Sequence, residues 1–91
     1  MAIAAERIER LHTFATEAVR AGEQDRARTY VRRARRIAER NRLELPRSIS
    51  RFSCDRCDVA LVPGQNARVR LQDGHVVISC SCGSHDRYPY R

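Results

Sequence analysis

Two stretches near the start of the chain carry apolar residues at the spacing of an α-helix. The apolar stripe of the first stretch consists of Ile8, Leu11, Ala15, Ala18 and Val19, with Phe14 beside it. Gly22 suits the position after a helix, because glycine readily takes the left-handed conformation that ends many helices. We therefore expect a first helix over residues 3–21.

A second helical pattern follows directly. Glu23 and Asp25 are acids that suit the positive end of a helix dipole, and the pattern runs to about Asn41. Its apolar stripe consists of Ala27, Tyr30, Val31, Ala34, Ile37 and Ala38. Because the break is short, we expect an antiparallel hairpin that packs stripe to stripe. The stripes are narrow, so we expect the hairpin to pack also on the rest of the chain and on a protein partner.

The pattern changes after the second helix. Pro46 disfavours helical backbone at Leu45, and residues 46–51 read as an ordered connector anchored by Leu43, Leu45 and Ile49. Residues 67–71 then alternate, which places Arg68 and Arg70 on one face of a strand. The dipeptide at positions 73–74, Asp-Gly, is typical of a tight hairpin, with residues 75–79 as the return strand.

The four cysteines form two pairs, Cys54-x-x-Cys57 and Cys80-x-Cys82. Two thiolate pairs on facing turns can close a tetrahedral zinc site, and closed thiolate sites are structural rather than catalytic. The second pair is one residue shorter than a standard zinc-binding turn, which leaves His85 as an alternative fourth ligand with Cys80 outside the site. A redox dithiol and unligated cysteines are further alternatives. We favour one structural Zn²⁺ on the four cysteines, with His12 and His75 as surface residues.

The charge is concentrated in the middle of the chain. All eighteen basic residues are arginines, and the net charge of the 91 residues is +7. Residues 26–51 hold ten arginines against two acids. One helix face carries Arg28, Arg32, Arg35, Arg36 and Arg40. This face is either solvated, with Glu39 as counter-charge, or directed at a polyanion. We favour the polyanion, because one acid leaves most of these arginines unpaired.

Basic and aromatic residues also surround the cysteines. They are Arg51, Arg56, Arg68, Arg70 and Arg87, together with Phe52, Tyr88 and Tyr90. Arginine for phosphates and flat side chains for unstacked bases are typical of RNA binding, although Phe52 and Tyr88 also suit a small core. No catalytic triad, carboxylate pair or phosphate-binding glycine loop is evident. The N-terminal region lacks the apolar segment of a signal peptide, and no apolar run has membrane-spanning length, so we expect a cytoplasmic protein without membrane contact.

The motifs together resemble a known family. They are Arg51-Phe52, Cys54-x-x-Cys57, Leu61-Val62-Pro63-Gly64-x-Asn66-x-Arg68-Val69-Arg70, Gly74-x-Val76-Val77-Ile78, Cys80, Cys82-Gly83 and Arg87-Tyr88-Pro89-Tyr90. With the preceding helices and Leu45-Pro46-Arg47, they look like the zinc-ribbon protein subunit of archaeal and eukaryotic ribonuclease P. The resemblance covers nearly the whole chain. It departs from the family at the second cysteine pair, which usually has two intervening residues.

The resemblance implies a fold and a set of partners. The fold is a small metal-bound α+β unit, with a helical hairpin over 1–45, a connector over 46–51 and a zinc ribbon with a small antiparallel sheet over 52–91. The hairpin would pair with an Sm-like barrel subunit of ribonuclease P. The heterodimer would bind the specificity domain of the ribonuclease P RNA and meet precursor tRNA indirectly. The zinc ligands would be Cys54, Cys57, Cys80 and Cys82.

These observations predict an RNA-binding, non-catalytic subunit of the ribonucleoprotein that removes the 5′ leader of precursor tRNA. The residues expected to contact RNA are Arg47, Arg51, Arg68, Arg70 and Arg87. The chain takes part in an enzyme only as a subunit, because it offers no catalytic group of its own. The alternative is a zinc-ribbon nucleic-acid-binding factor of the transcription or ribosome-associated class.

Overall fold

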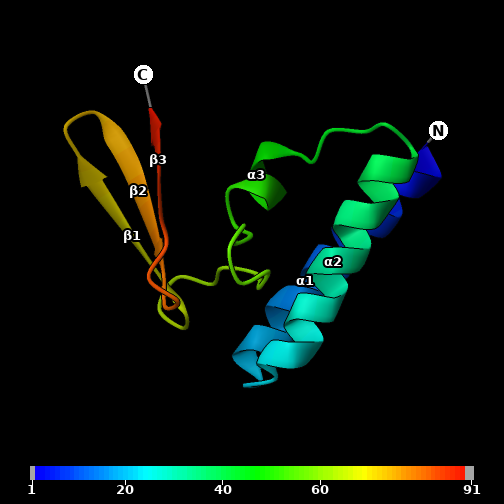
Figure 1. Ribbon diagram of the computed structural model, residues 1–91, viewed down its shortest axis with the longest axis horizontal. Coiled ribbons are helices and arrows are strands. Elements are labelled where there is room, and N and C mark those ends of the chain that lie inside the picture. Colours follow the sequence, from blue (N-terminus) through cyan, green and yellow to red (C-terminus); the bar gives the residue numbers. More distant parts are fainter. Residues whose placement is uncertain (1, 90–91) are drawn as a thin grey trace.

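The structure is a computed structural model that describes residues 2–89. Its elements are α1 (Ala2–Arg20), α2 (Gln24–Arg40), α3 (Arg47–Ser50), β1 (Ala67–Gln72), β2 (His75–Cys80) and β3 (His85–Pro89). The two long helices lie side by side, and the sheet stands apart from them with α3 and a looped segment in between (Figure 1). The predicted fold class, a helical hairpin followed by a small antiparallel sheet, is confirmed. Tyr90, one of the aromatic residues expected near the cysteines, lies outside the described residues.

The helical hairpin forms as its apolar pattern predicts. Gly22, with φ of 79°, follows α1, and its N–H donates to the Val19 carbonyl at 3.0 Å while the Glu23 N–H donates to the Ala18 carbonyl at 2.8 Å. This pair of bonds satisfies carbonyl groups that the end of α1 would otherwise leave open. The buried residues of the two stripes are Ile8, Ala15, Ala18, Val19, Ala27, Val31, Ala34 and Ala38.

The end of α2 uses the same bonding pattern without a glycine. The Leu43 N–H donates to the Ala38 carbonyl at 2.8 Å, and the Arg42 N–H donates to the Glu39 carbonyl at 3.3 Å. Arg42 occupies the left-handed position with φ of 53°. A side chain at this φ costs about 1–2 kcal/mol relative to ordinary helical backbone. The backbone at Arg42 therefore lowers the stability of the folded chain.

The connector contains a helical turn that the sequence pattern did not predict. Pro46 stands directly before α3, a place where its missing N–H costs nothing. Four residues are too few for an apolar period to show. Ile49 is buried and Leu45 packs beside it, whereas Leu43 is 39% exposed.

The sheet has the strand order β1-β2-β3, with both pairs antiparallel. The predicted tight turn is confirmed, since Asp73 (φ 50°) and Gly74 (φ 78°) join β1 directly to β2. β3 was not predicted as a strand. Its sequence, His-Asp-Arg-Tyr-Pro, has little apolar alternation, and only its pairing with β2 makes it extended.

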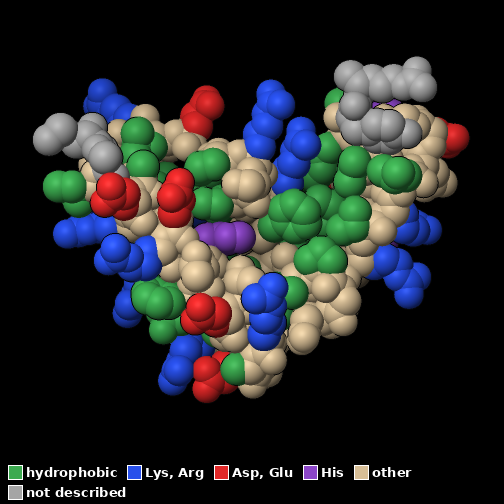
Figure 2. Space-filling view, turned by 180° about the vertical axis from the view of Figure 1, so that it is seen from behind, with side chains coloured by type: hydrophobic (Ala, Val, Ile, Leu, Met, Phe, Trp, Pro, Cys, Tyr) green, Lys and Arg blue, Asp and Glu red, His purple; other side chains and the backbone are tan. Residues whose placement is uncertain are grey.

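The core is divided between the two halves of the molecule. Ala60 and Val62, from the looped segment after the first cysteine pair, pack on the stripes of α1 and α2. A second cluster joins Cys54, Val59, Leu61, Ile78 and Cys80 under the sheet. Residues 59–62 therefore alternate between the two clusters and tie the ribbon to the hairpin. Seen from behind, basic side chains project from both halves, and hydrophobic side chains gather toward the sheet half (Figure 2).

A candidate metal centre and the basic surfaces around it

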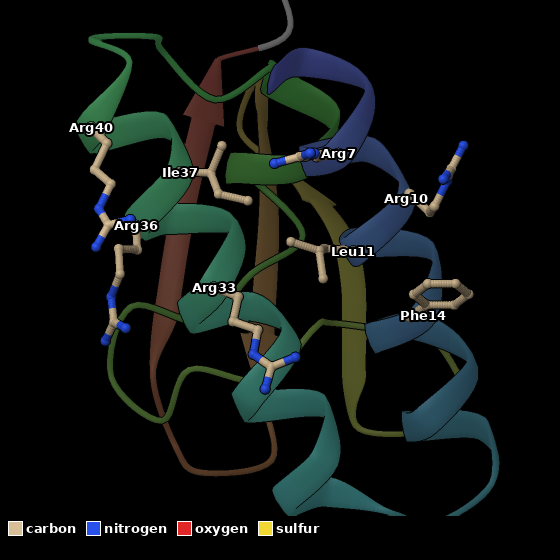
Figure 3. A pocket seen from close by; sticks show the side chains of 8 residues that line it. All are labelled: Arg7, Arg10, Leu11, Phe14, Arg33, Arg36, Ile37 and Arg40. Carbon is tan, nitrogen blue, oxygen red and sulfur yellow. The ribbon is translucent and has the colours of Figure 1, made fainter. Parts of the chain in front are cut away.

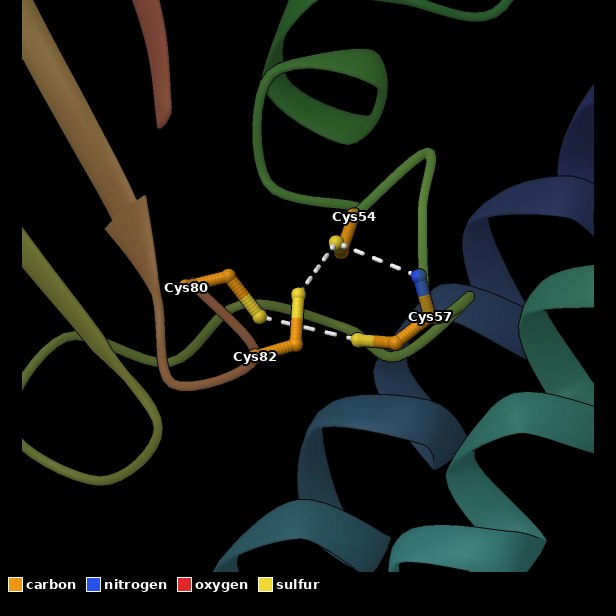
Figure 4. A group of neighbouring side chains, drawn as sticks. All are labelled: Cys54, Cys57, Cys80 and Cys82. Carbon is orange, nitrogen blue, oxygen red and sulfur yellow. Dashed lines mark hydrogen bonds between the residues drawn. The ribbon is translucent and has the colours of Figure 1, made fainter. Parts of the chain in front are cut away.

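Four thiols converge between the looped segment and the end of β2 (Figure 4). The Sγ atoms of Cys54, Cys57, Cys80 and Cys82 all lie within 4.8 Å of one another. The distance is 3.6 Å from Cys54 to Cys82 and 3.6 Å from Cys57 to Cys80. A tetrahedral site with Zn–S bonds of 2.3 Å separates its sulfurs by about 3.8 Å. The four cysteines are thus close enough to bind one metal ion.

The histidine alternative finds no support in the geometry. The His85 ring contacts the Ser79 hydroxyl, with Nδ1 2.7 Å from Oγ, and is not part of the cysteine group. The shortened pair nevertheless brings both of its sulfurs into the group, and Gly83 takes φ of 100° directly after Cys82. Its N–H donates to the Cys80 carbonyl at 2.9 Å, which closes the turn.

Hydrogen bonds and burial divide the four thiols into two with a lowered pKa and two with a raised pKa. The Ser84 hydroxyl and backbone N–H lower the pKa of Cys82 to about 6. Burial opposes ionisation of Cys54, yet bonds from Ser84 and from the backbone of Cys57 keep the pKa of Cys54 below its usual value. Burial raises the pKa of Cys57, and it raises the pKa of Cys80 to about 12. Thiolate character is therefore strongest in the two thiols beside Ser84.

Arginines of α2 hold the first cysteine turn rather than facing outward. Arg28 Nε donates to the Cys57 carbonyl at 3.0 Å, and Arg35 Nη2 donates to the Cys54 carbonyl at 3.0 Å. Asp58 accepts from Arg35 and, at 2.9 Å, from Arg32 Nε. The expectation that most arginines of this face are unpaired and directed at a polyanion is wrong for these three. Asp55 and Asp58, which pair with Arg32 and Arg35, lie on a turn distant in sequence, whereas Arg28 pairs with Asp25 on its own helix.

Asp58 occupies a demanding position in this contact. Its φ is 61°, a left-handed conformation that aspartate tolerates better than most residues. Although burial opposes ionisation, hydrogen bonds from Arg32 and Arg35 hold the pKa of Asp58 below its ordinary value. The carboxylate therefore carries its charge at neutral pH and joins α2 to the candidate metal centre.

His12 is a second correction. Its ring lies partly buried between α1 and the ribbon, with Nε2 3.4 Å from the Phe52 carbonyl oxygen. Burial lowers its pKa, so it is not the surface residue that we expected. Phe52 itself packs into the cluster under the sheet together with Tyr88.

Asn66 organises the loop that leads into the sheet. Its side chain is buried, accepts from the Val62 N–H at 2.8 Å and donates to the Ala60 carbonyl at 2.9 Å. Its own carbonyl accepts from the Ser81 N–H at 2.9 Å. The asparagine of the Pro-Gly-x-Asn motif therefore connects the segment that packs on the helices to the second cysteine pair.

The outer face of the sheet is basic. In the strand register Arg70 lies opposite Val77, which lies opposite Arg87, and Arg68 lies opposite Ser79. Residues opposite one another share a face of a sheet. The three arginines thus stand together on the side away from the cysteine cluster, and all are exposed. The expectation that Arg68 and Arg70 share a face agrees with this register.

The two other candidate arginines lie elsewhere. Arg47 opens α3 and is exposed. Arg51 is half-buried, with its guanidinium carbon 4.6 Å from the centre of the Tyr88 ring. The five arginines expected to contact RNA therefore divide between the sheet's outer face and the α3 side.

A groove with an apolar floor runs between α1 and α2 (Figure 3). Leu11, Phe14 and Ile37 form its floor. The rim consists of Arg7, Arg10, Arg33, Arg36 and Arg40. Within residues 2–89 none of these five takes part in an ion pair. The sequence pattern placed Arg36 and Arg40 on one helix, but only the packing of the hairpin brings arginines of both helices to one groove.

Among the described residues, no helix has the length and apolar character needed to cross a lipid bilayer.

Comparison with known proteins gives a consistent result. The family model described as "RNAse P Rpr2/Rpp21/SNM1 subunit domain" matches residues 7–83. A Halobacterium salinarum protein named "Ribonuclease P protein component 4" is 67% identical over 88 residues, covering 97% of this chain and 95% of that one. Proteins of the same name from Methanosarcina barkeri and Pyrococcus abyssi are 46% and 47% identical and cover 99% and 97% of this chain. The alignments cover 84% and 78% of those two proteins.

Solved structures agree with this grouping. A chain in a "cryo-EM structure of archaeal Ribonuclease P with mature tRNA" has a TM-score of 0.88 and 44% identity, covering 96% of this chain and 76% of that chain. The structure described as "Pfu Rpp21 structure and assignments" has a TM-score of 0.64 and 37% identity, covering 93% and 97%.

Proposed function

The chain belongs to the RNAse P Rpr2/Rpp21/SNM1 subunit family, and from this membership we propose that it is an RNA-binding, non-catalytic subunit of ribonuclease P. In this role it supports the catalytic RNA in the removal of the 5′ leader from precursor tRNA. The observation that carries the proposal is the match over nearly the whole chain to a subunit structure from archaeal ribonuclease P with tRNA. We propose that the chain acts in this role in the cytoplasm.

The cofactor of the proposed subunit is one structural Zn²⁺ held by Cys54, Cys57, Cys80 and Cys82. Four sulfur donors at near-tetrahedral separation suit zinc and leave no open position for a catalytic water. The ion would hold the two cysteine turns together and so fix the sheet. One zinc per chain, with four sulfur neighbours in metal-edge absorption, is the expected result. A nitrogen neighbour would restore His85 as a ligand.

The RNA partner is the specificity domain of the ribonuclease P RNA, and the outer face of the sheet is its main contact. Arg68, Arg70 and Arg87 share this face and are exposed, so they can meet phosphates, with Arg47 and Arg51 as further contacts from the α3 side. Arginine suits this task because its planar guanidinium offers paired donors to phosphate oxygens.

The test is RNA binding across a range of salt concentrations. The variant Arg68→Ala/Arg70→Ala should bind more weakly, and its slope of log affinity against log salt should flatten by about 1.4–1.8, the share of two phosphate contacts. The matched control is Arg33→Ala/Arg36→Ala, which removes the same charge from the helical groove. If both variants lose the same slope, the effect is one of net charge, and the sheet is not the RNA-binding face.

The protein partner is the Sm-like barrel subunit of ribonuclease P, and the groove between α1 and α2 is the proposed docking surface. An apolar floor rimmed by five arginines that form no ion pair within residues 2–89 suits an apolar segment with acidic flanks. The variant Ile37→Glu should abolish co-purification of the barrel subunit, because it buries a charge in the groove. Leu71→Glu is the control, since Leu71 is an apolar residue that is 70% exposed on the sheet. Equal retention of the partner by both variants would contradict this placement.

A further inference from the structure

One hydroxyl bridges the two cysteine turns. Ser84 Oγ lies 3.2 Å from Cys54 Sγ in the first turn and 3.6 Å from Cys82 Sγ in the second. We propose that Ser84 is a positioning residue for the metal, holding these two sulfurs at the separation that one ion requires. This inference rests on the proposed zinc site.

The direction of the bond follows from the chemistry of the ligands. A cysteine binds metal as the thiolate and then has no proton to donate. The Ser84 hydroxyl is the group that has one, so it donates to sulfur in the metal-bound state. Partners of this kind fix the orientation of metal ligands, and their loss typically lowers metal affinity 10- to 100-fold.

Backbone bonds hold Ser84 in place for this role. The Cys80 N–H donates to the Ser84 carbonyl at 2.9 Å, so residues 80–84 form a closed turn. Ser84 is therefore attached to one metal-ligating residue through its backbone while its side chain reaches two others. The backbone of Ser84 cannot move away without opening the turn.

The shortened second pair explains why such a residue is needed. With only Ser81 between its cysteines, this turn has one backbone N–H fewer than the Cys54-x-x-Cys57 turn, where the Cys57 N–H donates to Cys54 Sγ at 3.4 Å. Cys82 is also exposed, whereas Cys54 and Cys80 are buried. Packing therefore does little to orient Cys82, and the Ser84 hydroxyl adds a constraint to the one from the Ser84 backbone N–H.

The experiment compares two side chains of nearly equal shape in the full chain. Ser84→Thr keeps the hydroxyl and Ser84→Val removes it. Zinc affinity is measured by competition with a chromophoric chelator, and the cobalt-substituted forms are compared by their sulfur-to-cobalt absorption bands. Ser84→Val should bind zinc at least tenfold more weakly and shift the cobalt bands, while Ser84→Thr stays close to the unsubstituted chain. Ser81→Ala, which removes a neighbouring hydroxyl, should change neither property.

The outcomes separate this inference from the zinc proposal. If the unsubstituted chain does not bind one equivalent of zinc, the zinc site itself is wrong. If it does, equal affinity and equal cobalt spectra in the Val and Thr variants overturn the role of Ser84. Loss of metal binding in both variants also overturns it, because space rather than the hydroxyl would then be decisive. Loss in Ser84→Val alone supports it.

Discussion

The contact between Asp58 and the arginines of α2 yields a sharp prediction about stability. We consider Asp58→Asn, which removes the negative charge and keeps a residue type that tolerates the left-handed backbone at φ of 61°. The substitution therefore changes the ion pairs without adding backbone strain. We expect it to destabilise the docking of the first cysteine turn on α2.

The magnitude follows from the contacts that are lost. Asp58 accepts from Arg32 and Arg35, and hydrogen bonds to charged groups contribute about 1.5–3 kcal/mol each. Solvent screens part of this energy, since the side chain of Arg32 is 59% exposed, although those of Asp58 and Arg35 are only 25% and 27% exposed. An asparagine oxygen can still accept one bond. We therefore expect Asp58→Asn to lower the free energy of unfolding by about 1–2 kcal/mol.

The assay is urea unfolding at a fixed free zinc concentration, because bound metal adds to apparent stability. The control is Asp55→Asn on the same turn. Asp55 is 86% exposed and makes one contact of 3.3 Å with Arg35, so its substitution should cost less than about 0.5 kcal/mol. Equal losses in the two variants would refute the reasoning, because they would show that the Asp58 pairs stabilise no more than an exposed contact.

The pH dependence of the same variant has a definite sign. Burial of Asp58 opposes its ionisation, but the hydrogen bonds from the two arginines outweigh this effect. The pKa of Asp58 in the folded state therefore lies below its ordinary value. A depressed pKa contributes stability that is complete above the unfolded value of about 3.9 and is lost as the pH falls through the folded value. The difference between Asp58→Asn and the unsubstituted chain should therefore be the same at about pH 6 and pH 8. A difference that shrinks over this range would contradict the assignment.

Three further predictions concern a helix end, a loop and the metal. Arg42→Gly should raise the free energy of unfolding by about 1 kcal/mol in thermal or urea melts, because glycine takes φ of 53° without strain; a loss of stability would show that the Arg42 side chain matters more than its backbone. Asn66→Ala should lower the free energy of unfolding by about 2–3 kcal/mol, since the buried Val62 N–H and Ala60 carbonyl lose their partner. An unchanged midpoint of urea unfolding would contradict this. A strong chelator should collapse the amide dispersion of the sheet in NMR spectra, because a structural zinc supplies about 10–16 kcal/mol of apparent binding free energy. A sheet that stays folded without metal would show that the thiols alone suffice.

The local patterns in the sequence predicted the elements that depend on local physics. Apolar residues three and four apart gave the two long helices, and the Asp-Gly pair gave the tight turn between β1 and β2. Each of these signals lies within about one or two turns of backbone. The strand β3 and the helical turn α3 were missed, because a strand with little alternation and a helix of four residues carry no such period.

Some features of the candidate site were likewise predicted from the sequence, and others depended on the fold. The spacing of the cysteines predicted that Cys54, Cys57, Cys80 and Cys82 form one candidate metal site. The alternation of residues in β1 predicted that Arg68 and Arg70 share one face of the sheet. Motif matching over most of the chain was enough to indicate the family. In each case the signal comes from residues that are close in sequence, such as the two cysteines of one pair, or from a pattern of residues along the chain.

Only the tertiary structure decided which arginines are available to a partner. From the sequence, Arg28, Arg32 and Arg35 looked as free as Arg36 and Arg40, since all five share a helix face. The fold brings the Cys54–Asp58 turn against the first three, where Asp58 pairs with Arg32 and Arg35, and the Cys54 and Cys57 carbonyls accept bonds from Arg35 and Arg28. Arg28 also pairs with Asp25 on its own helix. The role of Ser84 is of the same kind, because the hydroxyl meets Cys54 across thirty positions of chain. Hydrogen bonds and ion pairs depend on distances of a few ångströms, and for residues far apart in sequence those distances exist only once the chain has folded.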